Sequence, residues 1–286
     1  MLKLQTRVET GTSPVRLSYS EGIVLLGSCF ADSVGERMAA AGFNVCANPF
    51  GTLYNPCSLA DAVRRLEEGT PFGPEDCVEM GAGAGFVCSF HHHTSFARRT
   101  AEEFLSSANS ALEEAGARWR GAGLVILTLG TAWCFRHRES GMVVSNCLKR
   151  PGTEFVRERL TLERTVSLLS GIVSRFPDKR FILTVSPIRH LADGAHANRL
   201  SKGTLLLAAD AVADGERIVY FPAYEILEDE LRDYRFYAED MVHPSTQAVD
   251  YIWERFCDFA LPDEARQTLQ ENLKAWRRSR HRPITG

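Results

Sequence analysis

The sequence lacks the patterns of a membrane protein and of a nucleic-acid-binding protein. Nowhere in its 286 residues do eighteen uncharged apolar residues run together, and the first fourteen residues have no apolar segment after their positive charge. These absences argue against a transmembrane helix and a secretory leader. The formal net charge of −3 gives no reason to expect nucleic acid or an anionic membrane as a partner. We therefore expect a cytoplasmic protein.

The cysteines show no spacing typical of a metal site or a disulfide framework. All eight are scattered without a single CxxC pair, at Cys29, Cys46, Cys57, Cys77, Cys88, Cys134, Cys147 and Cys257. In a reducing compartment such residues are mostly small buried apolar side chains.

The chain also has no internal repeat, no low-complexity linker and no strong break in composition. We therefore expect a single domain over residues 1–286, ending in a helix at about 263–280.

Short apolar runs alternate with amphipathic stretches. The runs are continuous in apolarity, which is typical of strands buried on both faces of a parallel sheet. We place the strands at 22–27, 43–48, 123–130, 180–187 and 217–223. Helical patterns occupy 31–42, 58–68, 101–118, 158–175, 200–213, 224–234, 246–259 and 263–280. The alternation predicts an α/β fold with a three-layer, doubly wound parallel sheet of about five strands.

One segment interrupts the alternation. Residues 77–96 have the pattern of a glycine-turned hairpin inserted between the second and third strands. Ligands of such sheets bind beyond the carboxyl ends of the strands, and we expect the insertion to overhang that edge.

Ser28 stands where the first strand ends and a helix begins. A serine at this place can cap the helix by accepting a hydrogen bond from a free amide. Alternatively, the sharp turn exposes the hydroxyl as a nucleophile beside helix-start amides that favour a developing oxyanion. The second interpretation requires a base.

Asp240 and His243 supply a candidate base far along the chain. Their spacing of three places both side chains on one side of a turn, and Pro244 keeps the segment a loop. The carboxylate can then hold one imidazole nitrogen while the other faces an alcohol, as in a serine triad.

These residues lie in blocks that resemble the GSCFA family. The residues GSCFA at 27–31 look like the motif that names the family. NPFGTLYNP (48–56), LTLGTAW (127–133), TVSPIRH (184–190) and DMVHPS (240–245) resemble its other segments in order. The resemblance runs from about residue 3 to 260. Because the family is grouped with SGNH or GDSL-like hydrolases, it implies a flavodoxin-like sheet of the SGNH hydrolase type. It also implies Ser28 as nucleophile, His243 as general base and Asp240 as its orienting carboxylate.

The resemblance fails at the oxyanion hole. SGNH enzymes usually place a glycine after the second strand and an asparagine after the third. Gly51 fits the first role through its backbone, beside the amide of Ser28, but no asparagine follows the third strand. Thr131 and Asn55 are both candidates for the missing donor. Because one such donor is worth on the order of 3 kcal/mol in the transition state, this departure argues against an efficient hydrolase.

Three other features compete for a role. Cys29 is intrinsically the better nucleophile, but only one of two adjacent residues at a turn can face the site, and we interpret it as a small buried residue. Consecutive histidines at 91–93 cannot easily converge on one ion, so we expect no metal and keep His93 as a substrate-facing candidate. Arg189 follows the fourth strand and is a candidate for binding a substrate carboxylate or phosphate, or else forms a surface ion pair.

The sequence thus predicts a serine hydrolase of the esterase or deacetylase type that uses neither a metal nor a cofactor. Its expected partner is a small-molecule or glycan ester, and the carbohydrate part of this expectation comes from analogy with the superfamily. Two alternatives stay open. One is a ligand-binding module of the same fold without catalysis, and the other is an acyltransferase that uses the same serine.

Overall fold

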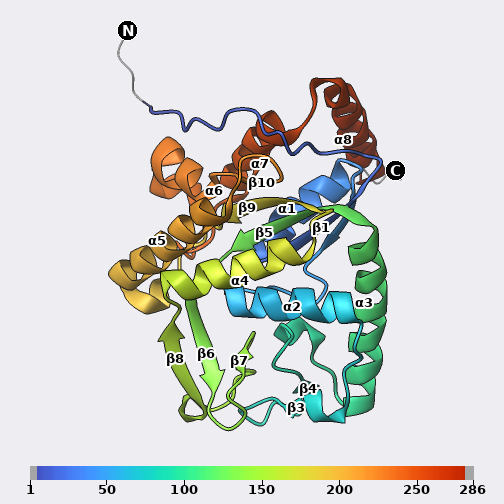
Figure 1. Ribbon diagram of the computed structural model, residues 1–286, viewed down its shortest axis with the longest axis vertical. Coiled ribbons are helices and arrows are strands. Elements are labelled where there is room, and N and C mark those ends of the chain that lie inside the picture. The colour runs from blue at the N-terminus through green and yellow to red at the C-terminus, as the bar shows by residue number, and fades with distance from the viewer. Residues whose placement is uncertain (1–4, 281–286) are drawn as a thin grey trace, which may run out of the picture.

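The computed structural model describes residues 5–280, and its centre is a five-stranded parallel sheet (Figure 1). The strands are β1 (Gly22–Gly27), β2 (Asn44–Ala47), β5 (Ala122–Leu129), β9 (Arg180–Val185) and β10 (Ile218–Tyr220). Their order across the sheet is β2-β1-β5-β9-β10. Counted along the chain this is the flavodoxin-like order 2-1-3-4-5. The predicted doubly wound sheet is confirmed.

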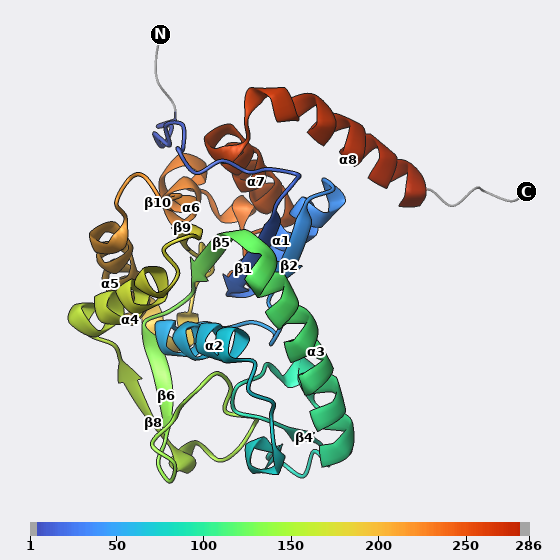
Figure 2. The ribbon, with the colours of Figure 1, turned by 45° about the vertical axis from the view of Figure 1, so that its right-hand side comes forward.

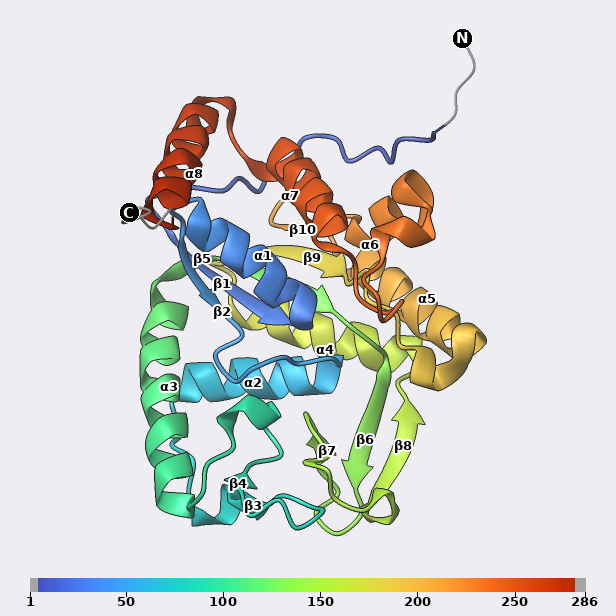
Figure 3. The same cartoon turned by 180° about the vertical axis from the view of Figure 1, so that it is seen from behind.

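Both faces of the sheet are buried, which explains the continuous apolar runs. Along β1, Ile23 and Leu25 enter one core whereas Val24 and Leu26 enter the other. Figures 1 and 3 show the helical layers from opposite sides. One layer contains α2 (Pro56–Glu68), α3 (Ala101–Gly121), α4 (Leu162–Arg175) and α5 (Gly194–Val212). The other contains α1 (Cys29–Ala40), α6 (Ala223–Glu225) with the π-helical turn after it, and α7 (Thr246–Ala260).

The last helix, α8 (Arg266–Arg280), extends away from the layers, as Figure 2 shows. Only part of it reaches the core, through Leu269 and Leu273. Among residues 5–280, no helix combines the length and apolarity needed to cross a membrane.

Two small antiparallel sheets lie together beyond α2 (Figures 1 and 3). The first pairs β3 (Val78–Glu79) with β4 (Val87–Cys88) and confirms the predicted inserted hairpin. The second has the order β7-β6-β8, with β6 at Trp133–His137, β7 at Val143–Val144 and β8 at Phe155–Arg159. Backbone bonds join the two regions, from Ser145 N–H to Phe90 O at 2.7 Å and from Gly81 N–H to Leu148 O at 2.9 Å.

The second small sheet corrects the sequence prediction. A helix was expected from residue 158, but Glu158 and Arg159 belong to β8, where they pair with β6. The helix begins only at Leu162, because the hydroxyl of Thr161 caps it by accepting the N–H of Arg164 at 3.2 Å. Tertiary pairing with β6 therefore overrides the local helical pattern of these two residues.

The carboxyl ends of the central strands are tied closely together. Gly27 has φ 144°, and a Cβ there would lie 2.1 Å from the carbonyl oxygen of Thr128, so only glycine lets β1 and β5 approach this closely. The fully buried Lys202 donates from Nζ to Gly130 O at 2.6 Å and to Ser186 O at 2.7 Å. These bonds link the residues that directly follow β5 and β9 at the carboxyl edge of the sheet.

Candidate active site

Ser28 is buried completely and caps α1. Its Oγ accepts the N–H of Phe30 at 3.2 Å and lies 3.4 Å from the hydroxyl of Thr128. Its own N–H donates to the backbone and side-chain oxygens of Thr128, at 3.2 and 3.1 Å. The sequence left two roles open for this hydroxyl, a helix cap and a nucleophile. In the structure it caps the helix.

Cys29, the first residue of α1, contacts the predicted base instead. Its Sγ lies 3.5 Å from Nε2 of His243, and Nδ1 of the same ring lies 2.6 Å from Oδ2 of Asp240. Cys29 is only partly buried, so the sulfur can meet both the base and a substrate. The expected approach of Ser28 to His243 is corrected: adjacent side chains at the turn diverge, and it is Cys29 that faces the imidazole.

The local structure around Asp240 explains its spacing from His243. Oδ1 of the aspartate accepts the N–H groups of Val242 at 2.8 Å and His243 at 2.9 Å, which closes a tight turn. Met241 lies at the centre of this turn with φ 57°. The other carboxylate oxygen is thereby aimed at the ring of His243, and one aspartate both builds the loop and orients the base.

Electrostatics fix the protonation states of two members of this group. Hydrogen bonds from the backbone and ring of His243, and from Val242 N–H, lower the pKa of Asp240 to about 2. The carboxylate is therefore charged throughout the neutral range. Burial raises the pKa of the Cys29 thiol, although hydrogen bonding to Tyr54 and to its own backbone N–H opposes this. The sulfur therefore rests as a thiol, and a base must remove its proton before attack.

The predicted backbone donors of the oxyanion hole are occupied by other partners. The N–H of Ser28 is held by Thr128, and that of Gly51 donates to Asn48 O at 2.7 Å. Gly51 is nevertheless constrained, because it has φ 78° and a Cβ there would lie 2.3 Å from Cβ of His93. This glycine shapes the loop after β2, and its role as an oxyanion donor stays a prediction.

The two predicted side-chain donors are also engaged. The hydroxyl of Thr131 lies 3.0 Å from that of Ser201 and accepts the N–H of Trp133 at 3.1 Å. Asn55 caps α2 by accepting the N–H of Ser58 at 3.0 Å, and its amide donates to the hydroxyl of the same serine at 3.0 Å. Both side chains are buried: Thr131 connects the end of β5 to α5 through Ser201, and Asn55 caps its own helix. Their roles as oxyanion donors stay predictions.

Tyr54 lies at the sulfur and was not assigned a role from the sequence. Its hydroxyl is 4.0 Å from Sγ of Cys29 and accepts a hydrogen bond from the hydroxyl of Thr52 at 3.2 Å. His190 packs edge-on against the tyrosine, with ring centroids 6.0 Å apart. Burial, followed by the charges of Lys202 and His243, lowers the pKa of His190 to about 4, so this ring is neutral near pH 7. Tyr54 lies within the block 48–56, but no residue-type rule distinguishes it from a core aromatic.

Asn48 is a second residue without a predicted role. Its Oδ1 accepts the N–H of Gly27 at 2.8 Å, and its Nδ2 donates to Ser28 O at 3.3 Å and to Oδ1 of Asp32 at 2.7 Å. This side chain therefore holds the turn that carries Cys29 from both sides.

The two predicted substrate-binding residues lie near the site with protein partners. Nη1 of Arg189 donates to Met241 O at 3.1 Å, and its guanidinium lies over the ring of Tyr237, 5.2 Å from the centroid. Arg189 thus braces the loop that carries His243, and it also lines a cavity of about 360 Å³. His93 bonds Ser95 through Nδ1 at 3.1 Å. The predicted contact of either residue with substrate stays a prediction.

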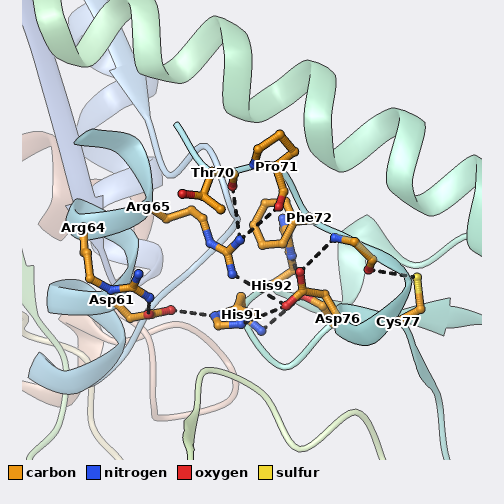
Figure 4. A network of polar contacts seen from close by, with 12 residues as sticks. Asp61, Arg64, Arg65, Thr70, Pro71, Phe72, Asp76, Cys77, His91 and His92 are labelled. Carbon is orange, nitrogen blue, oxygen red and sulfur yellow. Dashed lines mark hydrogen bonds and ion pairs between the residues drawn. The ribbon is translucent and has the colours of Figure 1, made fainter. Parts of the chain in front are cut away.

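The neighbouring histidines point to different places, as Figure 4 shows. His91 lies between two carboxylates, 2.5 Å from Asp61 and 3.5 Å from Asp76. His92 is fully buried near Phe72 and bonds the hydroxyl of Ser89 at 2.7 Å. Within residues 5–280, no group of three or more histidine, cysteine or acidic side chains is arranged to hold a metal ion.

The family of the chain follows from a comparison with family models. The model of the GSCFA family matches residues 22–256. The chain belongs to the GSCFA family. The matched segment includes all five strands of the central sheet together with Cys29, Asp240 and His243. The resemblance read from the sequence motifs is therefore confirmed.

This GSCFA-family chain was also compared with curated proteins and with solved structures. No curated protein matches it in sequence. Among solved structures, an acetyl xylan esterase from the rumen bacterium Butyrivibrio proteoclasticus is similar, with 12% identity and a TM-score of 0.41. The match covers 89% of this chain and 66% of the esterase, so the chain spans about two thirds of the length of that protein.

Proposed function

We propose that this GSCFA-family protein is an acyl hydrolase that cleaves an ester through Cys29, His243 and Asp240. The observation that carries the proposal is the 3.5 Å approach of Cys29 Sγ to His243 Nε2, with Asp240 behind the ring. A nucleophile, a base within reach and a third group that orients the base are the geometric requirements of such a triad. The hydrolase chemistry expected from the sequence is kept, and the nucleophile moves from Ser28 to the next residue.

The reaction proceeds through a thioester. Nε2 of His243 takes the thiol proton while Sγ attacks the ester carbonyl, so a C–S bond forms and the π electrons move to the carbonyl oxygen. The oxyanion collapses, the bond to the alcohol oxygen breaks, and the alcohol leaves with the proton from His243. Water then attacks the thioester as His243 takes one of its protons. The C–S bond breaks, the carboxylic acid departs, and the sulfur regains its proton.

The alternatives from the sequence differ at one step. Hydrolysis of an O-acyl group on a carbohydrate-like alcohol and transfer of that group to another alcohol both require acyl-Cys29, and they differ only in the acceptor. A ligand-binding module without catalysis forms no such intermediate. Detection of acyl-Cys29 therefore separates the enzymes from the binder.

The test uses 4-nitrophenyl acetate and mass spectrometry of the quenched protein. We expect one acetyl group on the peptide that contains Cys29, and we expect neutral hydroxylamine to remove it, as is typical of a thioester. Cys29→Ala should abolish the label, whereas Ser28→Ala and the control Cys46→Ala should retain it. An acetyl group on Ser28 that survives neutral hydroxylamine would restore the serine as nucleophile.

A further inference from the structure

The missing oxyanion donor has a replacement in the loop after β2. Tyr54 Oη lies 4.0 Å from Cys29 Sγ, on a side chain that is mostly buried. All four groups expected from the sequence to donate to an oxyanion make hydrogen bonds within the protein.

The tyrosine is fixed in place before any charge develops. Its carbonyl oxygen accepts two N–H groups from the end of β5, from Gly130 at 3.1 Å and Thr131 at 2.8 Å. The preceding residue, Leu53, donates its N–H to Gly27 O at 2.7 Å. The loop is thus attached to the same strand ends that position Cys29, so the hydroxyl and the sulfur belong to one rigid frame. Such preorganisation makes a donor valuable in the transition state.

The hydrogen bonds at Oη leave its proton available. Thr52 Oγ1 donates to Oη, which occupies a lone pair of the tyrosine and leaves the phenolic proton to point elsewhere. Burial raises the pKa of Tyr54, so the phenol stays protonated in the neutral range. The only other polar partner of Oη among the described residues is Cys29 Sγ.

We propose that Tyr54 is a catalytic residue that donates its phenolic hydrogen bond to the oxyanion formed on attack by Cys29. In the tetrahedral intermediate the oxygen is bonded to the carbon that carries the sulfur. A donor about 3 Å from that oxygen can lie about 4 Å from the sulfur, and Tyr54 Oη lies at 4.0 Å. Tyr54 keeps its proton throughout, and the proton transfers remain those of His243.

This inference rests on the proposed function, and its test separates two reactions of the same thiol. Acetylation by 4-nitrophenyl acetate passes through an oxyanion, whereas alkylation by iodoacetamide does not. Tyr54→Phe removes only the hydroxyl and keeps the ring against His190. We expect this variant to release 4-nitrophenolate about 10²- to 10³-fold more slowly in the acylation step. Alkylation of Cys29 loses only the hydrogen bond that lowers the pKa of the thiol, so it should slow by no more than about tenfold.

The control is Tyr234→Phe, which removes a hydroxyl from an exposed tyrosine in another segment and should change neither rate. Unchanged acylation in Tyr54→Phe would overturn the role of Tyr54 and leave the Cys29 nucleophile standing. An equal fall in acylation and alkylation would also overturn it, because the hydroxyl would then act only through the thiol. A natural chain that forms no acyl-Cys29 would contradict the proposed function itself.

Discussion

Ser28 and Cys29 are neighbours in the chain, but only Cys29 reaches His243. The serine hydroxyl faces Phe30 N–H and Thr128 and is fully buried, whereas the cysteine sulfur lies 3.5 Å from the imidazole. The division follows from helix geometry, because the residue before a helix turns its side chain back to the free amides and the first helical residue does not. One position along the chain thus separates a hydroxyl that caps α1 from a thiol that contacts the imidazole.

Ser28→Ala should therefore destabilise the protein and leave its chemistry nearly intact. Loss of the cap on α1 should lower the free energy of unfolding by about 1–2 kcal/mol, as measured by urea denaturation. The rate of acetylation at Cys29 should stay within a few fold. Thr100→Ala removes the corresponding cap of α3 and is the matched control for stability. A large loss of acetylation with unchanged stability would show that the Ser28 hydroxyl takes part in the reaction.

Asp240→Asn should impair the reaction with little effect on stability. Asparagine can still accept the N–H groups of Val242 and His243 through its Oδ1, but it cannot hold the His243 ring in the tautomer that leaves Nε2 free to accept a proton. We expect kcat for 4-nitrophenyl acetate to fall about 10²- to 10⁴-fold, in steady-state measurements near pH 7. Asp263→Asn, an exposed carboxylate away from the loop, should retain full activity. Equal activity of both variants would remove the carboxylate from the mechanism.

Asn48 offers a test of how the turn before Cys29 is held. Its side chain makes three hydrogen bonds, and its backbone has φ 42°, which an alanine adopts at a cost of about 1–2 kcal/mol. Asn48→Gly loses the side-chain hydrogen bonds, but glycine adopts the positive φ without strain. Asn48→Ala loses the same bonds and also has the cost of the positive φ. In denaturant unfolding, Asn48→Ala should be the less stable of the two by about 1 kcal/mol. Both should acetylate Cys29 more slowly than the natural chain. Full acetylation in both variants would show that the turn does not depend on Asn48.

The sequence predicted the central sheet well because strands that are buried on both faces consist of apolar residues without interruption. All five strands appear as continuous apolar runs, and their alternation with amphipathic helices determines the topology. The sheet formed by β6, β7 and β8 was missed, because its strands are short and partly exposed, and β6 and β8 contain charged residues. Arg136 and Glu158 illustrate this, since they are helix-compatible residues whose pairing across strands is a tertiary effect.

The sequence predicted the pairing of Asp240 with His243 but expected Ser28, and not Cys29, to lie against the imidazole. The Asp240–His243 pair was readable because both partners lie within one turn. Which of Ser28 and Cys29 faces that pair depends on the position at which α1 begins, and helix boundaries are among the least certain features of a sequence. The contact of Tyr54 with Cys29 joins residues that are 25 positions apart, and no local pattern encodes it.

His91 should make the stability of the protein depend on pH. It bridges α2 and the turn at Pro74–Asp76 through Asp61 and Asp76, and Arg65 lies beside it (Figure 4). Burial works to lower its pKa, but the two carboxylates outweigh this and raise it from 6.5 to about 8. The folded state therefore binds the proton more tightly than the unfolded state. The resulting stabilisation, on the order of 2 kcal/mol, is fully present below pH 6.5 and is lost as the pH rises through 8.

The measurement is the difference in unfolding free energy between the natural chain and His91→Gln, followed by urea denaturation from pH 6 to 9. This difference is needed because Lys202 titrates in the same range. Burial lowers the pKa of Lys202 to about 7, and above that pH this group makes the folded state progressively more stable. Both chains retain Lys202, so its contribution cancels. We expect the advantage of the natural chain to shrink by about 2 kcal/mol between pH 6 and 9. A constant difference would show that His91 holds its carboxylates as a neutral ring, through hydrogen bonds alone.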